Sequence, residues 1–225
     1  MNQNYMKNPI NPTKKTEFIP VILILLSIIA SFYFYSNFPN QVPTHWNYKG
    51  EVDAYSSKAF GAFFFPLINI VLYLMFLVIP YIDPRKDRYK DFKKVYHVFK
   101  GIFIAFMSLI YFYASLAGLG YPVSINTVVP AAVGLLFIVI GNYMSKIKTN
   151  WFLGIRTPWT LSNEEVWNKT HRLGGKVFIT MGVVMILGIF MPGETYWKIF
   201  PIMIIVLVFV PVVYSYFLYR KVEKK

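Results

Sequence analysis

Residues 60–82 read FGAFFFPLINIVLYLMFLVIPYI, an apolar run without one charged side chain. The hydrocarbon core of a bilayer is about 30 Å thick, and a helix needs roughly 20 apolar residues to cross it. The run therefore predicts a membrane-spanning helix. Similar stretches lie on both sides of it, so the chain is expected to be an all-α polytopic membrane protein with six spans. These predicted spans are 18–36, 60–82, 101–121, 127–144, 173–192 and 199–219.

The composition of the whole chain agrees with a membrane protein. Of its 225 residues 56% are hydrophobic and only 15% charged, whereas soluble domains carry about 25% charged residues. These values exclude a disordered chain, a collagen-like chain and an ordinary soluble enzyme. Cysteine is absent, which excludes disulfides, thiolate metal sites and a cysteine nucleophile.

The distribution of the basic residues predicts the orientation. Three of the 23 Lys and Arg residues, Lys49, Lys58 and Lys198, fall on one side of the predicted spans. The others lie in 1–17, 85–100, 146–176 and 220–225. By the positive-inside rule both termini are cytoplasmic. The net charge of +13 then follows from topology, and because the basic residues form short separate pieces, direct nucleic-acid binding is not expected.

The predicted regions follow from these spans. The segment 1–17 is polar and is expected to be a disordered cytoplasmic tail. The other regions are a first helix pair in 18–98 with a structured outer loop at 37–59 and a basic inner loop, the third and fourth spans in 99–145, an inner loop with an interfacial helix in 146–176, and the last two spans with a basic tail in 177–225.

The interior of the predicted spans argues against an ion-coupled pump. No ionisable side chain lies well inside a span, although such groups usually mark an ion or proton path. The polar interior residues are better explained as hydrogen-bonding contacts between helices. They include Asn69, Ser108, Ser115, Asn142 and Thr180.

The outer loop 37–59 is predicted to form a hairpin-like cap. Pro39 and Pro43 favour extended backbone, and Lys49-Gly50 supplies a turn. We expect Asp53 or Ser56 to cap the second span.

His45, Glu51 and Asp53 of this loop are the only cluster of possible metal ligands. Their spacing matches no known metal motif. We therefore expect His45 to form a hydrogen bond within the loop, and we expect neither a metal nor a cofactor. Trp46 and Tyr48 are placed at the membrane interface.

The inner loop 146–176 contains a helix-start signal. Ser162 followed by Glu165 matches a capping box. This pattern predicts a short interfacial helix that ends at Gly174-Gly175, before the fifth span. Glu165 and Lys169 are placed for an i,i+4 pair. The tryptophans expected to anchor this loop are Trp151, Trp159 and Trp167.

Arg156 lies in the turn before this helix and has three alternative roles. Its guanidinium can bind a lipid headgroup, pair with Glu164 or Glu165, or contact a cytoplasmic partner. His171 near the acids suggests acid–base chemistry, but neither a nucleophile nor a second base completes a catalytic site. We therefore predict that the protein is not an enzyme.

Two motifs make the chain resemble the SdpI family of bacterial membrane immunity proteins. The outer loop reads HWNxxGxxDxYxSK over 45–58, similar to the signature of an N-terminal domain that many such proteins carry. The inner loop reads GIRTPWTLSNEEVWxKTH over 154–171, similar to the inner-loop signature of the family. The two motifs and six spans cover most of the chain.

The resemblance implies a multi-pass protein of the bacterial plasma membrane. It implies protection from a secreted toxic peptide outside, and signalling in which a small cytoplasmic repressor is held at the membrane. By motif, the outer feature comprises His45, Trp46, Asn47, Gly50, Asp53, Tyr55, Ser57 and Lys58. The inner feature comprises Gly154, Ile155, Arg156, Thr157, Pro158, Trp159, Glu164, Glu165, Trp167, Lys169, Thr170 and His171. Whether these residues bind ligands or only stabilise the fold does not follow from the motifs.

Two other functions stay open at this point. The chain could be a transporter or lipid-handling protein for envelope-active compounds, which a polar cavity through the bundle would favour. It could also be a membrane enzyme, which a bound metal near His45 or a paired acid and base within hydrogen-bond reach would favour.

Overall fold

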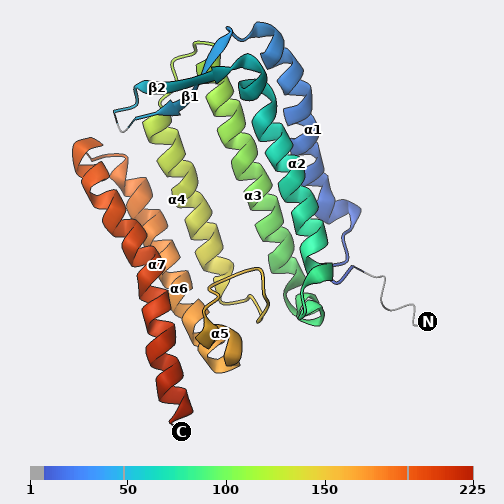
Figure 1. Cartoon of the computed structure of the whole chain (residues 1–225), viewed down its shortest axis with the longest axis vertical. Coiled ribbons are helices and arrows are strands. Elements are labelled where there is room, and N and C mark those ends of the chain that lie inside the picture. The colour runs from blue at the N-terminus through green and yellow to red at the C-terminus, as the bar shows by residue number, and fades with distance from the viewer. Residues whose placement is uncertain (1–7, 48, 192, 225) are drawn as a thin grey trace.

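A bundle of long helices forms the protein, with a β-hairpin at one end (Figure 1). The computed structural model describes residues 8–47, 49–191 and 193–224. The elements are α1 (Lys14–Asn37), β1 (Gln41–Trp46), β2 (Val52–Ser57), α2 (Lys58–Ile82), a 3-10 turn (Lys86–Arg88), α3 (Tyr89–Gly118), α4 (Ile125–Met144), α5 (Pro158–Ser162), α6 (Glu164–Gly188) and α7 (Gly193–Glu223). Six of the helices are long and apolar enough to cross a membrane, which confirms the predicted all-α polytopic fold.

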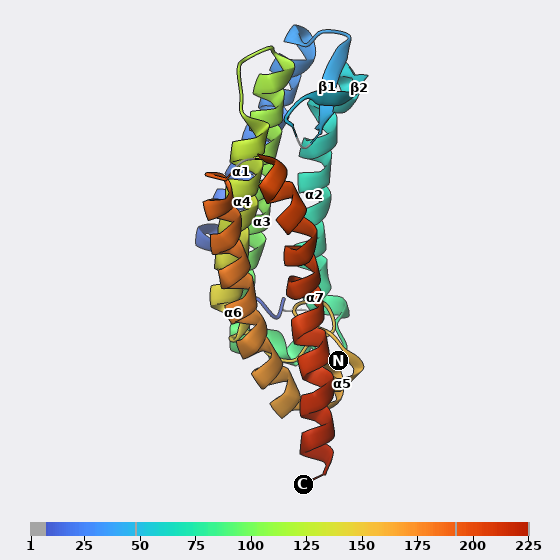
Figure 2. The same ribbon diagram turned by 90° about the vertical axis from the view of Figure 1, so that its left-hand side faces the viewer.

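The helices form two groups. In the first, α1, α2 and α3 contact one another; in the second, α4 packs along α6, and α6 contacts α7 (Figures 1 and 2). Glycines allow the close approach of α4 and α6, since a Cβ added at Gly141 would lie 2.5 Å from the Gly175 carbonyl oxygen. Further along the same two helices, a Cβ added at Gly134 would lie 2.7 Å from the Gly182 carbonyl oxygen. Small residues are common at such membrane helix contacts.

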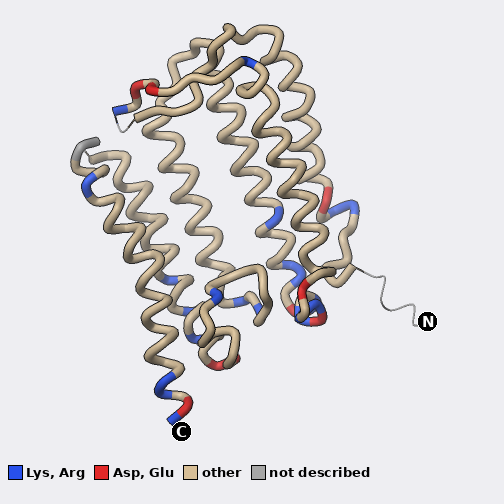
Figure 3. The backbone as a smooth tube through the Cα atoms, viewed as in Figure 1, with Lys and Arg blue, Asp and Glu red and all other residues tan. Residues whose placement is uncertain are grey.

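The two ends of the bundle differ in charge. Lys and Arg gather at the end opposite to the hairpin (Figure 3), and we call these the basic end and the hairpin end. A core of aromatic and aliphatic side chains lies at each end of the bundle. Phe34, Phe38, Val42, Ala62 and Tyr111 lie in the core at the hairpin end. Ile10, Phe76, Tyr89, Phe92, Val95, Tyr96, Phe99, Ile147 and Trp167 lie in the core at the basic end. In between, Asn69 donates to Ser108 Oγ at 3.0 Å, which confirms the predicted helix-contact hydrogen bond.

The described part of the N-terminal tail is ordered, contrary to the prediction of disorder over 1–17. Ile10 is fully buried, and its carbonyl oxygen lies 3.0 Å from His97 Nε2. Glu17 lies inside α1, and its two carboxylate oxygens lie 2.5 and 2.6 Å from the buried Lys100 Nζ. Lys100 itself is part of α3, which begins earlier than the third predicted span. Residues 1–7 of the predicted tail lie outside the described residues.

The inner loop folds differently from its prediction. A short helix does precede the fifth long helix, but it is α5 (Pro158–Ser162), which Thr157 caps. Asn163, not Ser162, caps the next helix, by accepting from the Glu165 and Val166 amides. That helix, α6, continues through Gly174-Gly175 into the membrane-spanning part, because these glycines pack on α4 and on Ile155 and do not end it.

Candidate functional sites at the two ends of the bundle

Asn47 and Gly50 shape the turn of the hairpin. Asn47 Oδ1 accepts from the amides of Lys49 (2.8 Å) and Glu51 (3.1 Å), and its Nδ2 donates to Glu51 Oε2. Gly50 has φ +83°, and a Cβ there would lie 3.0 Å from Asn126 Nδ2 in α4. These two motif residues therefore hold the hairpin turn in shape beside α4, and they fit the predicted hairpin-like cap.

The other outer-motif side chains fix the sides of the hairpin. His45 Nδ1 and Asp53 Oδ1 lie 2.5 Å apart across the strands, which confirms the predicted hydrogen bond of His45. Ser57, not Asp53 or Ser56, caps α2 by accepting from the Phe60 amide at 3.3 Å. Lys58 Nζ lies 4.8 Å from the centre of the Tyr35 ring, and Tyr55 is 58% exposed. Within the described residues, no three His, Asp or Glu side chains are grouped to hold a metal ion.

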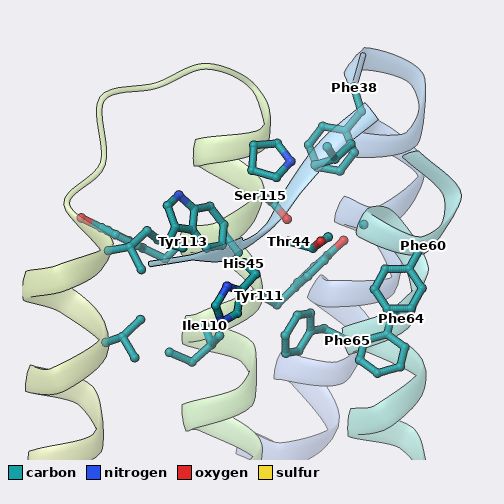
Figure 4. A pocket seen from close by; sticks show the side chains of 17 residues that line it. Phe38, Thr44, His45, Phe60, Phe64, Phe65, Ile110, Tyr111, Tyr113 and Ser115 are labelled. Carbon is teal, nitrogen blue, oxygen red and sulfur yellow. The ribbon is translucent and has the colours of Figure 1, made fainter. Parts of the chain in front are cut away.

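A cavity of about 400 Å³ lies beneath the hairpin. Figure 4 shows it between Phe60, Phe64 and Phe65 of α2 and Ile110, Tyr111 and Tyr113 of α3. The remaining lining residues are Phe38, Val42, Pro43, Thr44, His45, Trp46, Gly61, Ala114, Ser115, Ile125 and Val129.

Tight packing defines one wall of this cavity. A Cβ added at Gly118 would lie 2.7 Å from Val42 and 2.9 Å from Phe38. The hydroxyl of Tyr111 donates to the Ala62 carbonyl oxygen at 2.9 Å, which holds α3 against α2. The cavity is thus a preformed apolar space with hydroxyl groups and one imidazole in its lining, typical of a site for an apolar group.

A buried polar network organises the basic end. Asp83, 2% exposed, accepts from the Arg85 amide (2.7 Å), the Tyr89 hydroxyl (2.8 Å) and the Trp151 amide (2.9 Å). Asn150 is fully buried, and its Oδ1 accepts from the Leu153 amide at 2.6 Å. The network joins the α2–α3 turn to the 146–157 loop. Because each acceptor is held by several donors, the loop has a defined conformation.

His171 is the centre of the inner motif. Its Nε2 accepts from the Ile155 amide at 3.0 Å, and its Nδ1 lies 2.8 Å from the Trp167 carbonyl oxygen. Since one ring nitrogen accepts and the other donates, the ring is neutral in this geometry. Gly154 has φ +101°, and a Cβ there would lie 2.3 Å from His171 Nε2. The buried Trp167 ring stacks on His171 and donates its Nε1 hydrogen to the Ile147 carbonyl oxygen.

The next inner-motif residues attach the loop to the last helix. Thr157 and Thr160 form a reciprocal capping box around α5, with Pro158 in its first turn. Thr157 Oγ1 lies 3.0 Å from Ser215 Oγ of α7. The Trp159 ring packs edge-on against Tyr216 at 5.1 Å. The buried Thr157 and Thr160 therefore have a structural role in joining the loop to α7.

The charged inner-motif residues form one predicted pair and two contacts that were not predicted. Arg156 Nη1 donates to the Trp151 carbonyl oxygen at 2.7 Å, whereas one of its three alternative roles was an ion pair with Glu164 or Glu165. Glu164 pairs with Arg88, and Glu165 lies 2.6 Å from Lys169, which confirms the predicted i,i+4 pair. Thr170 is buried, whereas the side chains of Glu164, Glu165 and Lys169 are 50% exposed or more. These three side chains therefore lie at the surface of the basic end.

Sequence reasoning missed the cavity walls and the residues of the buried network. Asp83 and Arg85 flank Pro84 directly after an apolar run, a signal for a capped, defined turn. Asn150 and Tyr89 carry no comparable signal, because their roles depend on contacts between distant segments. The cavity likewise arises only when the hairpin is placed over α2 and α3.

Comparison with known proteins supports both motifs. A model of the SdpI/YfhL protein family matches residues 146–215, and a model of a domain of unknown function, DUF1648, matches residues 22–70. The chain is 27% identical to the immunity protein SdpI of Bacillus subtilis (strain 168) over 209 residues, which is 93% of this chain and 98% of that protein. No solved structure matches the chain.

Proposed function

Since this multi-pass membrane chain belongs to the SdpI/YfhL family, we propose that it is an immunity protein that protects a bacterium from a secreted toxic peptide. The observation that carries the proposal is the apolar cavity of about 400 Å³ under the hairpin. In the proposed orientation the hairpin end faces outward, where a secreted peptide arrives. The basic end then faces the cytoplasm, as the positive-inside rule requires.

The cavity suits an apolar side chain of the peptide. Burying one Leu- or Phe-sized side chain contributes about 1.5–3 kcal/mol, or roughly a 10- to 100-fold change in affinity. The aromatic walls from α2 and α3 supply this apolar contact, while Thr44, His45 and Ser115 lie in the lining as possible hydrogen-bond partners. Capture at this site removes the peptide from the bilayer before it acts there.

The proposal is tested by survival of a sensitive bacterium that expresses the chain. The host is titrated with the secreted peptide fraction of the organism from which the chain comes. Ala114→Trp fills the cavity, whereas Leu116→Trp on the same helix places an equal side chain at an exposed position outside it. We expect the intact protein and Leu116→Trp to protect, and Ala114→Trp to fail at equal membrane levels. Equal protection by both variants would exclude the cavity as the site.

The orientation has a separate test, because the chain has no cysteine. A single cysteine at the exposed Tyr55 of the hairpin should react with a membrane-impermeant maleimide in intact cells. One at the exposed Lys169 of the basic end should react only after the cells are opened. The reverse pattern would contradict the orientation.

We further propose that the exposed part of the inner motif holds a small cytoplasmic repressor at the membrane. The Glu165–Lys169 pair, 53% and 50% exposed, lies on the outer surface of α6, while Trp167 and His171 are buried and hold the loop. Exchange of the two charges keeps an i,i+4 pair but reverses its polarity toward a partner.

The test of repressor binding is a reporter fused to the promoter of the gene for this protein. We expect the peptide to raise reporter expression with the intact protein but not with Glu165→Lys/Lys169→Glu, while protection is retained. Lys221→Glu at an exposed position in the last turn of α7 is the control and should respond normally. An unchanged response in the exchange variant would refute docking at this pair.

A further inference from the structure

Another, smaller cavity lies between α6 and α7, where the loop before α5 meets the two helices. It measures about 250 Å³ and is lined by Phe178 of α6 and by Leu207, Val208, Pro211 and Val212 of α7. Ile155, Arg156 and Thr157 complete its lining. We call it the α6–α7 groove. Val208 is 51% exposed, so the groove is open at the surface of two helices that are long and apolar enough to cross a membrane.

A positively charged side chain lines this apolar groove, at the end of the groove nearer to the basic end of the bundle. Arg156 is the one charged side chain in the described lining. Its Nη1 donates to the Trp151 carbonyl oxygen at 2.7 Å, which holds the guanidinium on the loop that borders the groove. A guanidinium has five donors in a planar fork, so a bond through Nη1 leaves donors that can approach phosphate oxygens.

Interfacial side chains surround the same level of α7. Thr157 Oγ1 lies 3.0 Å from Ser215 Oγ, which places the Arg156 loop one turn beyond Pro211 and Val212 on α7. Trp159 packs on Tyr216, whose hydroxyl accepts from Arg220 Nη1 at 3.1 Å. Tryptophan, tyrosine and arginine concentrate where hydrocarbon meets the lipid headgroups. The cation end of the groove is therefore at headgroup level, and the apolar part points into the hydrocarbon.

We propose that the α6–α7 groove binds one anionic phospholipid. The phosphate pairs with Arg156, and an acyl chain runs along Pro211 and Val212 toward Val208. Basic pockets between membrane helices on the cytoplasmic side recognise anionic headgroups in this way. The combination of one fixed guanidinium and an apolar groove distinguishes this occupant from a protein segment or a free phosphate. The site is separate from the cavity under the hairpin and does not depend on the immunity proposal.

The experiment is native mass spectrometry of the full-length protein released from nanodiscs. The nanodiscs contain equal amounts of phosphatidylglycerol and phosphatidylcholine with identical acyl chains. We expect the intact protein to retain one phosphatidylglycerol about tenfold more than phosphatidylcholine, the ratio that one ion pair worth about 1.4 kcal/mol produces. Arg156→Gln should remove this preference, and Arg156→Lys should keep most of it. Glycerol phosphate without chains should not compete, which separates a lipid from a free phosphate.

Variants of the groove itself complete the test. Val208→Trp should lose bound lipid of both kinds because it fills the groove, whereas Val183→Trp, at an exposed position of α6 outside the groove, should retain it. A melting temperature equal to that of the intact protein identifies the variants that fold. If Arg156→Gln does not fold, the loss of bound lipid in Val208→Trp is the test of the proposal. A preference for phosphatidylglycerol that persists in folded Arg156→Gln would overturn the proposal. So would lipid retained by folded Val208→Trp, or equal retention of both lipids by the intact protein.

Discussion

Gly154→Ala should destabilise the basic end through a single contact. The new Cβ would lie 2.3 Å from His171 Nε2, so the imidazole must move. It then loses the hydrogen bond that Nε2 accepts from the Ile155 amide at 3.0 Å. The positive φ of +101° costs an alanine about 1–2 kcal/mol. The unsatisfied amide adds about 1–3 kcal/mol. The free energy of unfolding should therefore fall by about 2–5 kcal/mol.

Gly120→Ala is the control for this prediction, since Gly120 also has a positive φ, +86°, but meets no atom within 4 Å. It should lose only the backbone contribution of about 1–2 kcal/mol. The assay is denaturant unfolding in detergent micelles followed by tryptophan fluorescence. In a His171→Ala background the clash is absent, so Gly154→Ala should then cost no more than Gly120→Ala. Equal destabilisation of the two variants in the wild-type background would show that His171 does not hold the loop.

Three further predictions concern the packing and the buried polar groups. Gly141→Ala should lower the melting temperature, because the added Cβ would lie 2.5 Å from the Gly175 carbonyl oxygen, a backbone atom that cannot easily yield; thermal unfolding in detergent measures this, and an unchanged temperature would contradict the packing. Asp83→Ala leaves three donors without their acceptor and should cost roughly 3 kcal/mol or more in denaturant unfolding; a cost under about 1 kcal/mol would show that water replaces the carboxylate. Glu17→Gln leaves Lys100 buried without its counter-ion and should lower the free energy of unfolding by about 3–5 kcal/mol, measured by the same method. The double variant Glu17→Gln with Lys100→Met should recover most of this loss, and no recovery would contradict the ion pair.

The sequence predicts the six long helices well because their signal is local. Each is a run of apolar residues long enough for a bilayer, and no tertiary contact is needed to recognise it. The end of the interfacial helix was predicted wrongly for the opposite reason. Gly174-Gly175 resembles a helix stop, but the absent side chains make room for Ile155, Met144 and the Gly141 carbonyl oxygen. Contacts with distant segments decided the role of these glycines.

In the candidate sites too, contacts between residues close in the sequence were predictable, whereas contacts between distant segments were not. The His45–Asp53 and Glu165–Lys169 pairs follow from short spacing and are present. Lys100 was assigned to a position before a span, and its pairing with Glu17, 83 positions away, could not be read from a pattern. The cavity under the hairpin is not local either, since α2, α3, α4 and β1 all contribute to its walls.

Photo-crosslinking of the peptide to the cavity tests the central claim most directly. Benzoylphenylalanine replaces Tyr113, which lines the cavity, or Leu109, which is 47% exposed on the same helix outside it. Cells that express each variant are irradiated with the secreted toxic peptide, and the adduct is identified by mass spectrometry. We predict an adduct at position 113 and none at 109. Protection without an adduct at 113, or adducts only at 109, would contradict capture of the peptide in this cavity.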